Sequence, residues 1–164
     1  MVILGIDPGI AIVGWGALRY ENGRFTPVGF GSIQTAAGLK VEERLRQIHV
    51  GMTEIIEKYK PDVMSVEELF WNTNQKTGIV VAEARGVILL SAHEAGVPIF
   101  EYTPLQVKQA IVGYGRAEKK QVIAMVTSLL GLKKPPKPDD TADAIALAIC
   151  HGHTAASPLS NFYK

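Results

Sequence analysis

The chain opens with the stretch VILGIDPG at residues 2–9, in which apolar residues run into an acid, a proline and a glycine. An apolar run that ends in this way is typical of a buried β-strand stopped by a turn. Ligands of sheets with parallel strands bind at the carboxyl ends of those strands. The stretch therefore predicts a buried first strand at residues 2–6, with Asp7 at a sheet edge where a ligand can bind.

The segments that follow predict a mixed sheet with helices on its faces. Residues 12–20 and 25–35 are rich in β-branched and aromatic residues and flank the turn at 21–23, so they form an antiparallel hairpin. Apolar residues then recur at helical spacing from Val41 to Tyr59. We expect an α/β fold with a mixed five-stranded sheet, an antiparallel meander plus parallel strands, flanked by helices. The remaining expected elements are strands at 62–67 and 97–102 and helices at 78–95, 104–112, 117–132 and 139–153.

Length and composition indicate one domain without disulfides. The chain has 164 residues, of which 47% are hydrophobic, and a single cysteine, Cys150. We expect residues 1–154 to form one domain and residues 155–164 a flexible C-terminal tail. The N-terminus lacks the leader of an exported protein, and charged residues interrupt the apolar stretch 78–95. We therefore expect a cytoplasmic protein that does not enter a membrane.

Charge is distributed unevenly along the chain, although its net value is only +1. Residues 103–138 contain seven lysines and arginines against one glutamate, whereas the rest of the chain carries more acids than bases. A concentrated basic segment can bind phosphates on one surface while acids elsewhere hold cations. The charge pattern alone is equally compatible with a solvated lysine-rich face.

Four acidic residues are predicted to meet at one site. Asp7 and Glu67 each end a strand, and the helical crossover before the second strand suggests that the two are parallel neighbours with both carboxylates at one edge. Asp140 and Asp143 are three residues apart and share one face of the last helix. Converging carboxylates repel one another unless cations join them, and Mg²⁺ and Mn²⁺ prefer oxygen ligands. Two such ions can activate a water and stabilise the leaving oxygen of a phosphodiester, so we expect hydrolysis of nucleic acid.

Each of these acids also has a purely structural interpretation. Asp139, Asp140 and Asp143 lie where a helix N-terminus favours acids, and Asp7 precedes a Pro-Gly turn. Glu67 is harder to explain in this way, because it ends an apolar strand and glutamate is rarely buried unless it is paired.

Six motifs together resemble the RuvC family of bacterial Holliday junction resolvases over nearly the whole chain. One motif alone is a weak signal, but their order and spacing over about 140 residues are not expected by chance. In chain order they are Gly5-Ile6-Asp7-Pro8-Gly9, Val66-Glu67-Glu68-Leu69-Phe70, Ala84-Arg85-Gly86, Gln106-Val107-Lys108-Gln109 with Val112-Gly113, Ala117-Glu118-Lys119, and Asp140-Thr141-Ala142-Asp143-Ala144.

The resemblance implies an RNase H-like fold, a homodimer, catalysis by divalent metal ions, and symmetric cleavage of two strands of a four-way DNA junction. It implies RuvA and RuvB, the branch-migration proteins, as partners. It also places Lys108 and Lys119 near the scissile phosphates and Phe70 against bases of the opened junction. The implied metal ligands and catalytic acids are Asp7, Glu67, Asp140 and Asp143, holding two Mg²⁺ ions that Mn²⁺ can replace. The expected DNA contacts are Phe70, Asn74, Lys108, Arg116, Lys119 and Lys120.

Two other interpretations stay open on the sequence. A strand followed by an Asp-x-Gly turn also begins ATP-binding modules of the actin and sugar-kinase type, although those need two domains to close on a nucleotide. A junction-binding relative without activity would have lost metal ligands, whereas all four acids are present here. Glu68 and Asp139 are extra acids beside the four and are further candidates for metal binding.

Apolar residues surround most of the helix expected at 78–95, whereas a surface helix needs only one apolar stripe. The sheet can cover one face, and the same helix of a second copy is the simplest cover for the other. We therefore expect a two-fold homodimer in which Leu89 faces outward toward the partner.

Overall fold

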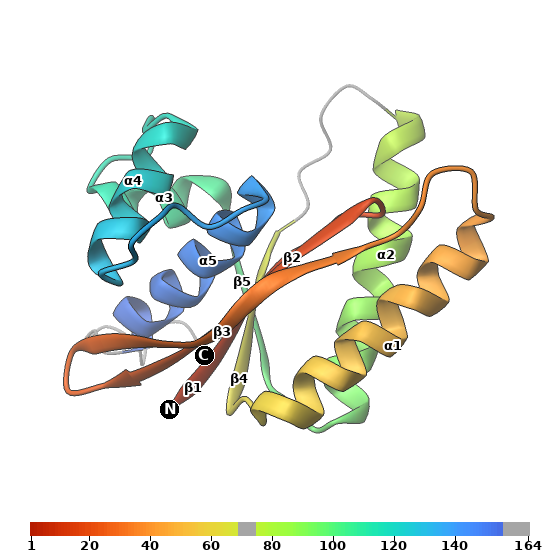
Figure 1. Cartoon of the computed structure of the whole chain (residues 1–164), viewed down its shortest axis with the longest axis horizontal. Helices are drawn as coiled ribbons and strands as arrows, with labels where there is room; N and C mark the ends of the chain where they lie inside the picture. The colour runs from red at the N-terminus through yellow and green to blue at the C-terminus, as the bar shows by residue number, and fades with distance from the viewer. Residues whose placement is uncertain (69–74, 156–164) are drawn as a thin grey trace.

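Figure 1 shows the computed structural model, which describes residues 1–68 and 75–155. Its centre is a five-stranded sheet in the order β3-β2-β1-β4-β5. β1, β2 and β3 are antiparallel neighbours, whereas β4 is parallel to both β1 and β5. The mixed sheet expected from the sequence is therefore confirmed. The strands are β1 (Val2–Asp7), β2 (Ile12–Glu21), β3 (Arg24–Gln34), β4 (Val63–Glu67) and β5 (Ile99–Tyr102).

Helices cover both faces of the sheet (Figure 1). One face carries α1 (Val41–Tyr59) and α2 (Gln75–Glu94). The other face carries α3 (Pro104–Val112), α4 (Lys119–Leu129) and α5 (Asp139–Ala155). None of the helices among residues 1–68 and 75–155 is both long and apolar enough to cross a membrane.

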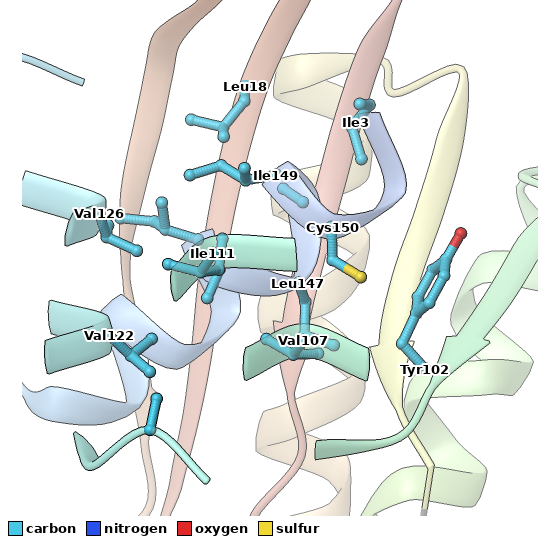
Figure 2. Packing of buried hydrophobic residues seen from close by; sticks show 14 residues of the cluster. Ile3, Leu18, Tyr102, Val107, Ile111, Val122, Val126, Leu147, Ile149 and Cys150 are labelled. Carbon is cyan, nitrogen blue, oxygen red and sulfur yellow. The ribbon is translucent and has the colours of Figure 1, made fainter. Parts of the chain in front are cut away.

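Two hydrophobic cores result, one on each face. Successive residues of a strand point to opposite faces, so Ile3 of β1 packs toward α5 while Leu4 packs toward α1 and α2. Figure 2 shows the first core, in which Val107 of α3 and Val126 of α4 pack around α5. The sheet is thus buried on both sides, and its strand ends are the places where polar side chains can gather.

Some helix and strand ends differ from the sequence expectation by a few residues. α2 begins at Gln75 and not at residue 78, and α4 spans Lys119–Leu129 and not 117–132. The start of α4 is set by Glu118, whose backbone N–H donates to the Gln121 side chain at 2.8 Å. Its end precedes Gly131, whose φ of 59° belongs to the left-handed region.

α5 is buried along most of its length because small residues let it lie directly on the sheet. Alanines at positions 142, 144, 146 and 148 have no exposed surface. A Cβ atom at Gly5 would collide with the Ala144 carbonyl, and one at Gly14 would collide with the Asp140 carbonyl. The Ser65 hydroxyl of β4 donates to the Leu147 carbonyl at 2.8 Å. These contacts place α5 against β1, β2 and β4, with its first turn beside β2.

Candidate active site

β1 and β4 bring Asp7 and Glu67 to the same edge of the sheet. The two strands are parallel and pair Ile6 with Val66, so each acid is the next residue at the end of its strand. The parallel pairing expected from the sequence is confirmed. On its other side Asp7 is paired with Gly14 of β2, which closely approaches the α5 backbone at Asp140. Three strands and the first turn of α5 therefore meet around Asp7.

The four predicted acids lie close together, and two of them, Asp7 and Glu67, have a raised pKa. Burial, followed by the charges of Glu67, Asp143 and Asp140, raises the pKa of Asp7 to about 8, while Lys119 acts in the opposite direction. Burial and then Asp143 raise the pKa of Glu67. At both Asp7 and Glu67 the neighbouring carboxylates disfavour ionisation because like charges repel. The four acids therefore share one site, which is rich in negative charge and short of compensating cations.

Lys119 is the basic residue in closest contact with these acids. It begins α4, and its Nζ lies 2.7 Å from Asp143 Oδ2. Desolvation lowers the pKa of this ammonium, but the hydrogen bond to Asp143 and the charges of the nearby aspartates outweigh desolvation and raise it. Lys119 is therefore a stable cation that neutralises one carboxylate of the site.

Lys108 is a second lysine near the site. It lies in α3, and its charge opposes part of the rise in the pKa of Glu67. α3 follows β5 directly and begins with a reciprocal cap. The Gln106 N–H donates to Thr103 Oγ1 at 3.2 Å, and the Thr103 N–H donates to Gln106 Oε1 at 2.8 Å. The capped start of α3 fixes the direction in which the helix leaves the sheet.

The chemistry of the site fits a hard divalent cation. Among the described residues, no three acidic, histidine or cysteine side chains form a ready-made metal cage. The donor atoms are nevertheless carboxylate oxygens, which Mg²⁺ and Mn²⁺ prefer, and a cation beside Asp7 would favour the ionised form that its raised pKa of about 8 disfavours at neutral pH. The residues that could hold such ions are Asp7, Glu67, Asp140 and Asp143.

The other predicted site residues are less closely connected to the acids. Asp139 is held by Lys137 at 2.7 Å, and Lys120 pairs with Glu118 at 2.8 Å. Arg116 and Glu68 are exposed. Phe70 and Asn74 lie outside the residues that the structure describes.

Sequence reasoning left two features of the site without a role. Gly14 permits the close approach of α5, and Arg85 donates from Nε to the backbone carbonyl of Glu67 at 3.2 Å. Arg85 carries a detectable signal in the sequence, because it is a charged residue within the apolar run of α2. Gly14 carries none, because a glycine in a strand does not reveal which backbone approaches it.

Acids at the ends of β1 and β4 and in the first turn of α5, on this mixed sheet, define a nuclease of the RNase H-like class. The sequence pattern of the family described as "Crossover junction endodeoxyribonuclease RuvC" matches residues 3–151. RuvC of Clostridioides difficile strain 630 is 54% identical over 94% of this chain and 91% of its own length. The chain belongs to the RuvC family, whose nucleases are metal-dependent.

Solved structures agree with the family assignment. The Thermus thermophilus RuvC structure has a TM-score of 0.87 and 37% identity, covering 94% of this chain and 95% of that one. The structure of T. thermophilus RuvC in complex with Holliday junction substrate has a TM-score of 0.86 and 35% identity over the same shares of the two chains. The RNase H-like fold and the family resemblance are confirmed, and the ATP-binding module is no longer a competing interpretation.

Proposed function

We propose that this protein resolves four-way DNA junctions by metal-dependent hydrolysis of phosphodiester bonds in two strands of like polarity. The observation that carries the proposal is the gathering of Asp7, Glu67, Asp140 and Asp143 at one strand edge, with Lys119 in contact at 2.7 Å. Membership of a family named for junction cleavage supports it. A four-way junction has two-fold symmetry, which suits a dimer that carries two such sites.

In this proposal the four acids hold divalent ions, two Mg²⁺ per site, with Mn²⁺ as a substitute. When bound, the ions activate the attacking water and stabilise the leaving oxygen. Lys119 and Lys108 offset negative charge that develops on the phosphate, because both lie within electrostatic reach of the acids. Lys119 would then exchange its contact with Asp143 for one with the substrate.

DNA contacts outside the acid cluster belong to the same proposal. Arg116 and Lys120 are exposed beside Lys119 in the sequence and can bind phosphates. Phe70 is proposed to stack on a base of the opened junction, and Asn74 to contact the same region. RuvA and RuvB are the proposed partners, and the bacterial cytoplasm, where such junctions form, is the proposed location.

A homodimer through α2 is also part of the proposal. Ile79 and Leu90 are 54% and 51% exposed, and Glu83 and Gly86 complete an outward row with them along the helix. Leu89, the outward position expected from the sequence, packs partly against the core instead. A second copy of α2 could bury the outward row and place two acid clusters on one junction.

The test is cleavage of a synthetic four-way junction whose strands are labelled one at a time. With Mg²⁺ we expect paired cuts at symmetric positions in two strands of like polarity, and neither EDTA samples nor linear duplex of the same sequence should be cut. Binding without any cut in Mg²⁺ or Mn²⁺ would identify a non-catalytic junction-binding protein. Cuts of equal rate in the linear duplex would show a general nuclease.

A further inference from the structure

Arg85 stands out as a charged side chain placed inside the fold on α2. Only 12% of its side chain is exposed. Its Nε donates to the Glu67 carbonyl oxygen at 3.2 Å, and its second terminal nitrogen lies 2.7 Å from Glu101 Oε2. Removing a guanidinium from water costs free energy, so a nearly buried arginine needs partners that offset this cost.

The contacts of Arg85 join α2, β4 and β5 at Glu67, one of the four acids. Glu67 is the last residue of β4, and Glu101 lies in β5 opposite Val66. Just beyond the end of β4, the Glu68 N–H donates to the Tyr102 carbonyl of β5 at 2.9 Å. The end of β4 is thus held by β5 through the backbone and by α2 through Arg85.

The ion pair with Glu101 is a close charge contact without hydrogen-bond alignment. Although 2.7 Å separates the two atoms, the buried terminal nitrogen of Arg85 makes no well-directed hydrogen bond within the described part of the chain. The directional contact of this guanidinium is therefore the one to the Glu67 carbonyl. Glu101 supplies charge that keeps the guanidinium in place, and its own side chain is 47% exposed.

We propose that Arg85 is a positioning residue that sets where the Glu67 carboxylate lies, and that Glu101 is its anchor. A metal ligand has to be held within about 0.5 Å of its productive position, and partners of the ligands commonly decide metal affinity. Arg85 holds the backbone of Glu67 and does not touch the reacting atoms. The inference rests on the proposed function, because it concerns Glu67 as a metal ligand.

The location of Arg85 gives this role a further consequence. α2 also carries the outward row proposed to contact a second copy of the chain, and Gly86 of that row is the next residue after Arg85. A displacement of α2 would therefore move the Glu67 carbonyl through the same side chain. Arg85 links the proposed dimer helix to the acid cluster.

The test compares Arg85→Met, Arg85→Lys and Glu101→Gln with the unmutated protein. For each we would measure the Mn²⁺-induced rise in Tm, the Mg²⁺ concentration for half-maximal junction cleavage, and junction affinity in EDTA. Arg85→Met should raise the half-saturating Mg²⁺ concentration about tenfold and shift the Mn²⁺ dependence of Tm equally, with junction affinity unchanged. Arg85→Lys and Glu101→Gln should give smaller shifts in the same direction.

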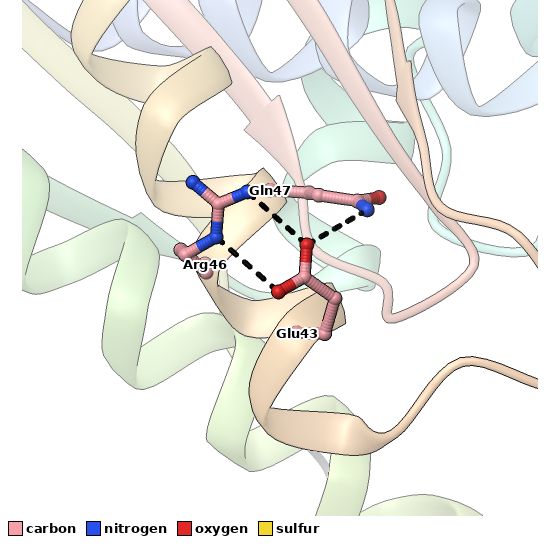
Figure 3. Close-up of polar contacts among 3 residues, drawn as sticks. All are labelled: Glu43, Arg46 and Gln47. Carbon is pink, nitrogen blue, oxygen red and sulfur yellow. Dashed lines mark hydrogen bonds and ion pairs between the residues drawn. The ribbon is translucent and has the colours of Figure 1, made fainter.

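The matched control is Arg46→Met. Arg46 is an exposed arginine of α1 that pairs with Glu43 at 3.2 Å, in the group with Gln47 shown in Figure 3. The Arg46→Met variant should leave the Mn²⁺-induced rise in Tm, the Mg²⁺ requirement and the junction affinity unchanged. A lower Tm for Arg85→Met with an unaltered metal requirement would overturn the inference and make Arg85 purely structural. If Arg85→Met does not fold, Glu101→Gln takes its place, and an unaltered metal requirement in that variant would overturn the inference. Failure of the unmutated protein to bind Mn²⁺ or cleave would instead reject the proposed function.

Discussion

Asp7 is the residue on which the electrostatics of the site converge. Its pKa is raised from 3.8 to about 8, first by burial and then by three other carboxylates. A group in this state is unfavourable for folding when it is ionised and favourable for binding a cation. The burial and the neighbouring negative charges that raise the pKa of Asp7 thus lower the stability of the metal-free protein at high pH, and they favour the binding of a cation.

Asp7→Asn should make the metal-free protein more stable at alkaline pH. Between pH 3.8 and about 8 the folded protein keeps a proton on Asp7 that the unfolded chain has lost, so the free energy of unfolding falls as pH rises. The variant has no such proton to lose. Urea unfolding in EDTA should show a gain on the order of 1 kcal/mol or more at pH 8.5 and a smaller one at pH 5. Parallel pH profiles for the two proteins would contradict the raised pKa.

The same variant should lose junction cleavage while keeping junction binding. It removes a proposed metal ligand and one negative charge that would face the phosphates. Cleavage at the unmutated rate would mean that Asp7 is not a ligand. An electrophoretic mobility-shift assay in EDTA measures the affinity of the variant for the junction.

Lys119→Met should slow cleavage by about 10²-fold or more while leaving Tm within a few degrees of the unmutated value. The ion pair with Asp143 is partly exposed, so its loss has a small effect on stability. Single-turnover cleavage at saturating protein measures the chemical step. Lys58→Met, which changes an exposed lysine near the end of α1, is the control and should be normal. A large fall in Tm for Lys119→Met would make this lysine structural.

At the scale of elements, the site depends on how closely α5 lies against the sheet. The first turn of α5 carries Asp140, and the Thr141 hydroxyl on that turn donates to the Gly31 carbonyl of β3 at 3.0 Å. Gly14 of β2 permits this approach because it has no Cβ atom. Gly14 and the Thr141 hydroxyl thus hold the first turn of α5 against the sheet. This position brings the aspartates of α5 next to the acids at the ends of β1 and β4.

Gly14→Ala should push the first turn of α5 away from β2. The added Cβ would meet the Asp140 backbone, which cannot give way as a flexible side chain can. We expect a loss of about 1 to 3 kcal/mol in the free energy of unfolding and a larger fractional loss of cleavage than of junction binding. Denaturant unfolding and cleavage assays on the same preparation measure both. Unchanged cleavage would show that the position of α5 tolerates this displacement.

At the scale of the whole molecule, the sheet is covered on both faces within one chain, yet α2 leaves apolar residues in solvent. Leu90→Glu should therefore give monomers, because a buried charge would oppose contact between two copies. Sedimentation at micromolar concentration compares it with the unmutated protein, for which we expect a dimer. Leu129→Glu alters a leucine of similar exposure on α4 and should remain dimeric. An unmutated chain that sediments as a monomer would refute the dimer.

The order of strands and helices, and the meeting of Asp7 with Glu67, could be predicted from the sequence because they depend on local patterns. Apolar periodicity, turn residues and the handedness of crossovers act over short stretches of chain. The spacing of Asp140 and Asp143 likewise required only the helix repeat. These local rules determined the sheet, the acidic edge and, with the motifs, the family.

Only the tertiary structure decided the details that join separate segments. The contact of Arg85 with the Glu67 carbonyl, the approach of Gly14 to Asp140, and the pairing of Lys119 with Asp143 each involve elements from different parts of the chain. The exposure of Leu90 in place of Leu89 depends on how α2 is rotated against the core. No periodic pattern encodes such distances and rotations, because they follow from the packing of many side chains at once.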